Sequence, residues 1–125
     1  LMSSPTVERV AVCVTRTKNE RAELLVQAGD QRPGASIALP EITLLPDEHP
    51  AEAAWRLVTS TFAKDACQTF HKLAQVDTAV GGYFVFQTGL EEANIEPTGS
   101  HIWVDQSEAT ESLKATWHPA LEKLR

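Results

Sequence analysis

Long apolar runs, cysteine motifs and a surplus of basic residues are all missing from this sequence of 125 residues. No apolar run approaches the roughly 20 residues that a membrane-spanning helix needs, so we expect no membrane partner. The N-terminal stretch LMSSPTVERV lacks the basic and apolar regions of a signal peptide. Cys13 and Cys67 have no motif spacing, and a reduced cytoplasmic protein is the simplest interpretation. The 17 acidic against 11 basic residues, with a formal net charge of −6, argue against a nucleic-acid partner.

The length bounds the organisation of the chain. A chain of 125 residues makes one domain that is large enough to bury about two-thirds of its unfolded surface. We expect a disordered N-terminal tail at residues 1–6 and a single α/β domain at residues 7–125.

Alternating apolar residues predict several strands. Val10, Val12 and Val14 share one side of a strand at residues 7–15, which therefore has at least one buried face. A polar turn at 17–20 leads to a return strand at 22–28, and a loop at 29–36 precedes a short strand at 37–39. Strands at 73–76 and 83–87 should pair through a turn near Gly81-Gly82. Residues 101–104 form a last short strand.

Capping residues and prolines predict the helices. A first helix begins at His49-Pro50, where the missing N–H of proline costs nothing, and ends near residue 62 or 64. Asp105 or Ser107 caps a second helix that runs to about residue 113, and a third helix follows at 120–124.

The first helix should have two distinct faces. The core-facing stripe is predicted to consist of Ala51, Ala54, Trp55, Val58 and Phe62. The neighbouring face carries Ala53, Leu57, Ser60 and Thr61. Trp103 should also pack in the core, whereas the sequence leaves Trp117 unassigned.

The stretch 39–62, LPEITLLPDEHPAEAAWRLVTSTF, resembles the Nudix box, whose pattern is G-x5-E-x7-R-E-U-x-E-E-x-G-U with U an aliphatic residue. Setting Arg56 on the motif arginine places Glu48 on the first glutamate and Val58 on the aliphatic position. The other motif residues are replaced: three glutamates by Leu57, Ser60 and Thr61, and two glycines by Ile42 and Ala63. The order of the elements is similar to a Nudix domain from about residue 7 to residue 124, although only residues 39–58 are specific.

The resemblance implies a Nudix-like α/β/α sandwich with a mixed central sheet. Nudix hydrolases cleave a diphosphate linked to another group, using water that is activated by Mg²⁺ or Mn²⁺, and such ions prefer anionic oxygen ligands. Residues 57, 60 and 61 have i, i+3, i+4 spacing and share one helix face, where three carboxylates would form a metal platform. With one leucine and two hydroxyls there, we expect no metal cofactor and no metal-dependent hydrolysis.

The surviving box residues have a structural and a catalytic interpretation. Arg56 either holds an ion pair with Glu48 or Glu52 or belongs to the remnant of an active site. If the chain is active, Glu48, Glu52 and Arg56 are the expected catalytic residues, with the two glutamates binding Mg²⁺ or Mn²⁺. Glu41 either points toward that site or faces solvent. One acidic loop is either solvated or supplies a further ligand: Glu91, Glu92 and Glu96.

Three hypotheses for function follow from these observations. In the favoured one, the domain is catalytically silent and binds a small nucleotide-like ligand or a protein. The expected ligand-binding residues are then Glu41, Leu57, Ser60 and Thr61. The second hypothesis is a divergent Nudix hydrolase that cleaves a nucleoside diphosphate linked to another group. The third is a structural or assembly role as a homodimer.

Overall fold

The computed structural model describes residues 7–28, 37–62, 69–78, 81–90, 96–97, 99–113 and 117–124. Several predictions lie outside these residues: the tail at 1–6, the loop at 29–36, the glycine replacement Ala63, and the acids Glu91 and Glu92. The strands are β1 (Val7–Lys18), β2 (Arg21–Ala28), β3 (Ile37–Ala38), β4 (Glu41–Thr43), β5 (His71–Thr78), β6 (Gly81–Gly89) and β7 (His101–Asp105). The helices are α1 (Pro50–Phe62), α2 (Gln106–Ser112) and α3 (His118–Leu121).

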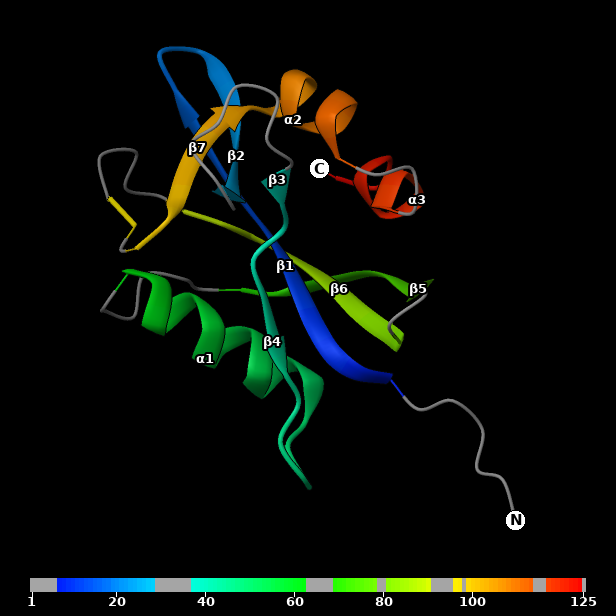
Figure 1. The fold of residues 1–125 in the computed structure, drawn as a ribbon. Helices are drawn as coiled ribbons and strands as arrows, with labels where there is room; N and C mark the ends of the chain where they lie inside the picture. The colour runs from blue at the N-terminus through cyan, green and yellow to red at the C-terminus, as the bar shows by residue number, and fades with distance from the viewer. Residues whose placement is uncertain are drawn as a thin grey trace.

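The described strands form one mixed sheet around β1 (Figure 1). β1 pairs in parallel with β6, whose other edge pairs antiparallel with β5. The opposite edge of β1 pairs antiparallel with β2 and with β4. β2 in turn pairs with β3 and β7. Because one ladder is parallel and the others are antiparallel, the predicted mixed sheet is confirmed.

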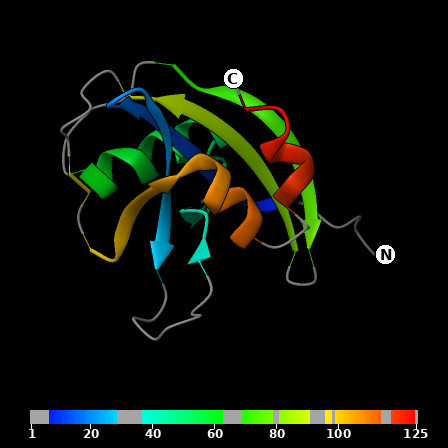
Figure 2. The ribbon, with the colours of Figure 1, turned by 90° about the horizontal axis from the view of Figure 1, so that it is seen from above.

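Helices cover both faces of this sheet. Figures 1 and 2 show α1 on one face and α2 with α3 on the other. The alternation of β1 explains the two layers, because Val10, Val12 and Val14 face α1 while Ala11 and Cys13 face the other helices. A strand with both faces buried lies at the centre of a sandwich. The predicted α/β/α sandwich is therefore confirmed, and the two buried faces of β1 agree with the prediction of at least one.

Local sequence signals account for the turns and helix starts. Asn19 and Glu20, between β1 and β2, have φ values of 53° and 65°, and positive φ at both central positions is what a type I′ hairpin turn requires. Asp105 caps α2 by accepting hydrogen bonds from the backbone N–H groups of Ser107 and Glu108. Both the polar turn and the aspartate cap agree with the sequence prediction. The last helix begins at His118, two residues earlier than predicted, because Pro119 fits its first turn.

One strand was not predicted at all. Residues 41–43 were assigned to the box loop, but they form β4 and pair with residues 9–11 of β1. Such a short segment carries too few side chains to show an alternation. Among the described residues, no helix has the length and apolar character needed to cross a membrane.

The predicted orientation of α1 is wrong in one important respect. Trp55 was assigned to the core, yet 48% of its surface is exposed. The buried face of the helix instead consists of Ala53, Ala54, Leu57, Val58, Thr61 and Phe62. Two adjacent alanines allow the helix to approach the sheet closely, and a bulky indole next to them then projects outward. The prediction gave too much weight to the hydrophobicity of tryptophan and too little to its size.

The other two tryptophans support the core. Trp103 stacks on Phe62 with ring centroids 6.1 Å apart, so it packs against the core as predicted but is only partly buried. Trp117, which the sequence left unassigned, is buried and packs edge-on against Tyr83 at 5.0 Å. Trp117 therefore closes the core beneath α3 on the face opposite α1.

Candidate functional site

The loop that enters α1 is held by an ion pair between Glu48 and Arg56. Arg56 donates from Nε to Glu48 Oε2 at 3.1 Å and from Nη2 to Oε1 at 2.9 Å. Arg56 Nη2 also donates to the carbonyl oxygen of Thr43 at 2.9 Å, and the backbone N–H of Leu45 donates to Glu48 Oε1 at 3.1 Å. The hydrogen bonds from Arg56, followed by that from Leu45, lower the pKa of the Glu48 carboxyl. The predicted ion pair between Arg56 and Glu48 is present, and it fastens the end of β4 to the helix.

The three positions of the missing glutamates do not form one open surface. Leu57 and Thr61 are buried, with only 8% and 5% of their surfaces exposed. Thr61 Oγ1 donates a hydrogen bond to the Leu57 carbonyl oxygen at 2.8 Å, so this hydroxyl is used within the helix. Ser60 is exposed. The neutral face predicted for ligand binding is therefore largely packed against the sheet.

The residues that are present do not fit the divalent metal of Nudix hydrolases. Mg²⁺ demands nearly octahedral oxygen ligation, usually with carboxylates. Both oxygens of Glu48 already accept hydrogen bonds from Arg56, and Leu57 offers no oxygen in its side chain. Within the described part of the chain, no three or more His, Cys, Asp or Glu side chains lie close enough together to hold a metal ion.

A groove of about 400 Å³ runs along the outer face of α1. It is lined by Glu48, Ala51, Glu52, Trp55 and Arg56. The groove thus brings together all three residues predicted for a divergent hydrolase, Glu48, Glu52 and Arg56. It also includes Trp55, which sequence reasoning missed as a site residue. The available signal was the Ala53-Ala54 pair, which can cover the sheet without the indole.

Glu41 lies on the other face of the sheet. It pairs across the ladder with Ala11, and residues opposite each other in a ladder share a face, here the face of α2 and α3. The Glu41 carboxylate accepts a hydrogen bond from Arg9 Nη1 at 2.9 Å, and the same Arg9 nitrogen donates to Tyr83 Oη at 3.4 Å. The structure does not bring Glu41 together with Leu57, Ser60 or Thr61. Ligand binding by these four residues stays a prediction.

A second group of side chains near the C-terminal end of α1 was not predicted from the sequence. The Arg16 guanidinium lies 4.2 Å from the centre of the Trp103 ring and donates to Glu23 Oε1 at 2.8 Å. Trp103 in turn stacks on Phe62. The indole Nε1 of Trp103 is buried and has no hydrogen-bond partner within the described part of the structure. A buried donor without an acceptor costs free energy.

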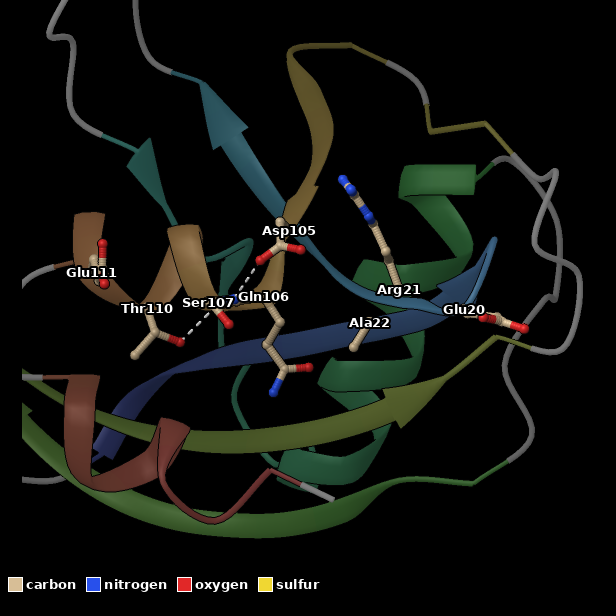
Figure 3. A pocket seen from close by; sticks show the side chains of 8 residues that line it. All are labelled: Glu20, Arg21, Ala22, Asp105, Gln106, Ser107, Thr110 and Glu111. Atoms are coloured by element: carbon tan, nitrogen blue, oxygen red, sulfur yellow. Dashed lines mark hydrogen bonds between the residues drawn. The ribbon is translucent and has the colours of Figure 1, made fainter.

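A larger cavity of about 600 Å³ lies between the β1–β2 turn and the start of α2 (Figure 3). It is lined by Glu20, Arg21, Ala22, Asp105, Gln106, Ser107, Thr110 and Glu111. Asp105 accepts from the Ser107 N–H at 3.0 Å, and Thr110 Oγ1 donates to the Gln106 carbonyl oxygen at 2.8 Å. These polar groups serve the helix itself. None of the residues predicted from the Nudix box lines this cavity.

Solved structures resemble the whole chain. No protein-family model and no curated protein matches the sequence. A mutT/nudix family protein from Listeria innocua superposes with a TM-score of 0.74 at 15% identity, covering 97% of this chain and 92% of that one. The NUDIX domain of Shewanella oneidensis NrtR, complexed with ADP ribose, gives a TM-score of 0.70 at 13% identity, with coverage of 97% and 87%. The chain has the Nudix fold.

This Nudix fold is also similar to a domain solved with a protein partner. The C-terminal domain of mouse MUTYH, in complex with human PCNA, gives a TM-score of 0.66 at 18% identity, covering 92% of this chain and 81% of that one. At such low identities, the likeness establishes the arrangement of helices and strands only. The fold predicted from the box is confirmed.

Proposed function

We propose that this Nudix-fold domain is a binding module that has lost metal-dependent hydrolysis of diphosphates. The observation that supports this most directly is the face of α1 that the Nudix box would furnish with acids. It carries Leu57, Ser60 and Thr61, so it contributes no negative charge. Leu57 and Thr61 are also packed into the core.

The loss follows from the chemistry of metal activation. A divalent ion can lower the pKa of bound water only if anionic ligands hold the ion in place. Glu48 Oε1 already accepts hydrogen bonds from Arg56 and from the backbone N–H of Leu45, and Oε2 accepts one from Arg56, so this carboxylate has a single lone pair left for an ion. Those contacts hold the β4–α1 loop. We therefore propose that the domain functions without Mg²⁺ or Mn²⁺.

A protein is the partner that the surface of α1 favours. The groove beside Trp55 contains an exposed tryptophan and an arginine, which are residue types enriched in protein interfaces, and its acidic side chains resemble the polar rim of such interfaces. The similarity to a MUTYH domain solved with PCNA supports a protein-binding role for this fold.

A small nucleotide-like ligand is the second candidate. The similarity to an NrtR domain complexed with ADP ribose supports this class of ligand. Such a ligand would be bound but not cleaved.

Phosphorus NMR of ADP-ribose mixed with the protein tests the proposal. A cleaved diphosphate gives monophosphate signals, whereas bound and intact ligand changes only the position or width of the diphosphate signals. We expect no monophosphate signals with Mg²⁺ or Mn²⁺ present. Nucleoside diphosphates linked to other groups are tested in the same way.

The opposite result would support a divergent hydrolase. Monophosphate signals that require metal and disappear in Glu48→Gln or Glu52→Gln would contradict the proposed loss of hydrolysis. In that case, an acid such as Glu96 would be tested as an additional ligand. Size-exclusion chromatography with light scattering addresses the homodimer hypothesis separately. The cytoplasmic location inferred from the sequence stays a prediction.

A further inference from the structure

We infer that the groove on the outer face of α1 binds a basic segment of a partner protein, with an arginine or lysine side chain seated against Trp55. This inference rests on the proposed binding function and specifies the partner. The groove is lined by Glu48, Ala51, Glu52, Trp55 and Arg56. It lies on the side of α1 that faces away from the sheet.

The groove contains a large aromatic ring that is exposed to solvent. Trp55 exposes 48% of its surface although it lies in the middle of a helix with an otherwise regular buried face. Indole rings are enriched in protein interfaces because they supply much contact area with little conformational freedom to lose. Ala51, one turn before Trp55, adds a small apolar surface to the same groove.

Negative charge lies beside the exposed ring of Trp55. Among the residues that line the groove, Glu48 and Glu52 are acidic and Arg56 is basic, which gives the lining a net charge of −1. Arg56 is paired with Glu48, so its charge is balanced within the loop. Glu52 is exposed at the edge of the groove beside Trp55. Negative charge therefore remains next to the aromatic ring.

These two features select one class of partner. A guanidinium or ammonium group is attracted to the face of an indole ring, and a carboxylate beside the ring strengthens its binding. An acidic partner would be repelled by Glu52 and by the overall charge of −6. The aliphatic stem of an arginine or lysine would also cover the apolar surface of Ala51. A basic segment with a neighbouring apolar residue satisfies the whole groove.

Selection of random peptides displayed on phage tests this inference on the full chain. We expect enriched peptides to carry arginine or lysine and to lose binding when these residues are replaced by glutamine. Trp55→Ala should weaken the selected peptides about tenfold, equivalent to about 1.4 kcal/mol. Glu52→Gln should weaken them up to about fivefold, with a smaller effect at high salt.

Two variants serve as matched controls. Ile102 on β7 is 46% exposed, so Ile102→Ala removes a similarly exposed apolar side chain that does not line the groove. Glu122→Gln removes an exposed acid that does not line the groove. Neither variant should change peptide affinity. All four variants should retain the far-ultraviolet circular dichroism of the unmodified chain.

Three results would overturn the inference. The first is a selection without enriched peptides, and the second is enrichment of acidic or uncharged peptides. The third is a concentration-dependent dimer that Trp55→Ala abolishes, which would assign the groove to a second copy of the chain. Hydrolysis is measured independently by phosphorus NMR, so failure of the peptide selection and failure of the proposed loss of catalysis are distinguishable.

Discussion

Replacing Leu57 with alanine tests the orientation of α1 and hence the packing of the helix face that carries Leu57, Ser60 and Thr61. The Leu57 side chain is 8% exposed and packs with Val58 and Phe62 against the sheet. Truncating such a leucine typically costs 2–5 kcal/mol, because buried area is lost and a cavity remains, and we expect about 3 kcal/mol here. With an unfolding entropy of about 2.1 cal/mol/K per residue, this loss lowers the melting temperature by about 10 °C.

Trp55→Ala provides the comparison that decides the orientation. Half of Trp55 already contacts solvent, so its removal leaves no enclosed cavity, and we expect a loss of about 1 kcal/mol or less. Had Trp55 been in the core, the cost would have been about 3–5 kcal/mol. Thermal unfolding followed by circular dichroism measures both variants, with Leu57→Met as a control that conserves volume. If Trp55→Ala destabilises the protein more than Leu57→Ala does, α1 is rotated and the groove does not exist.

Three further predictions concern titratable groups. The pKa of Glu48 is lowered from 4.5. The ionised Glu48 carboxylate therefore stabilises the fold above pH 4.5, and this stabilisation is lost as the pH falls through the lowered pKa. Glu48→Gln should make acid unfolding less steep. Burial, and then the Glu41 carboxylate, raise the pKa of Tyr83 above 10. Because Tyr83 is the only tyrosine in the chain, ultraviolet titration reports it directly, and Glu41→Gln should lower the midpoint. Burial raises the pKa of Cys13 to about 12, so in a Cys67→Ser variant a thiol reagent at neutral pH should label the protein only when it unfolds. Rapid labelling of the folded variant would contradict the burial of Cys13.

The layers of the fold follow from patterns that are local in the sequence. Alternation along β1 was visible because Val10, Val12 and Val14 recur at every second residue. The burial of both faces of β1 is compatible with this alternation. Proline at position 50 and aspartate at 105 set helix starts through their own backbone chemistry. Such signals need no knowledge of the rest of the molecule.

The site was harder to predict because it depends on how α1 is rotated against the sheet. Trp55 and Leu57 are both apolar and lie two positions apart, so the helical period alone allowed either to face inward. The small side chains of Ala53 and Ala54 decided the matter through close packing, which becomes visible only in three dimensions. Glu41 was misplaced for a similar reason, since its face depends on pairing with β1 thirty residues earlier in the chain.

Calorimetric titration of Mn²⁺ into the full chain tests most directly whether the domain lacks a metal site. We expect no saturable heat up to millimolar metal, both for the unmodified protein and for Glu48→Gln, because Leu57, Ser60 and Thr61 offer no carboxylate and Glu48 is held by Arg56. Saturable binding at micromolar Mn²⁺ that Glu48→Gln removes would contradict the claim. It would show that the loop around Glu48 opens to form a metal site.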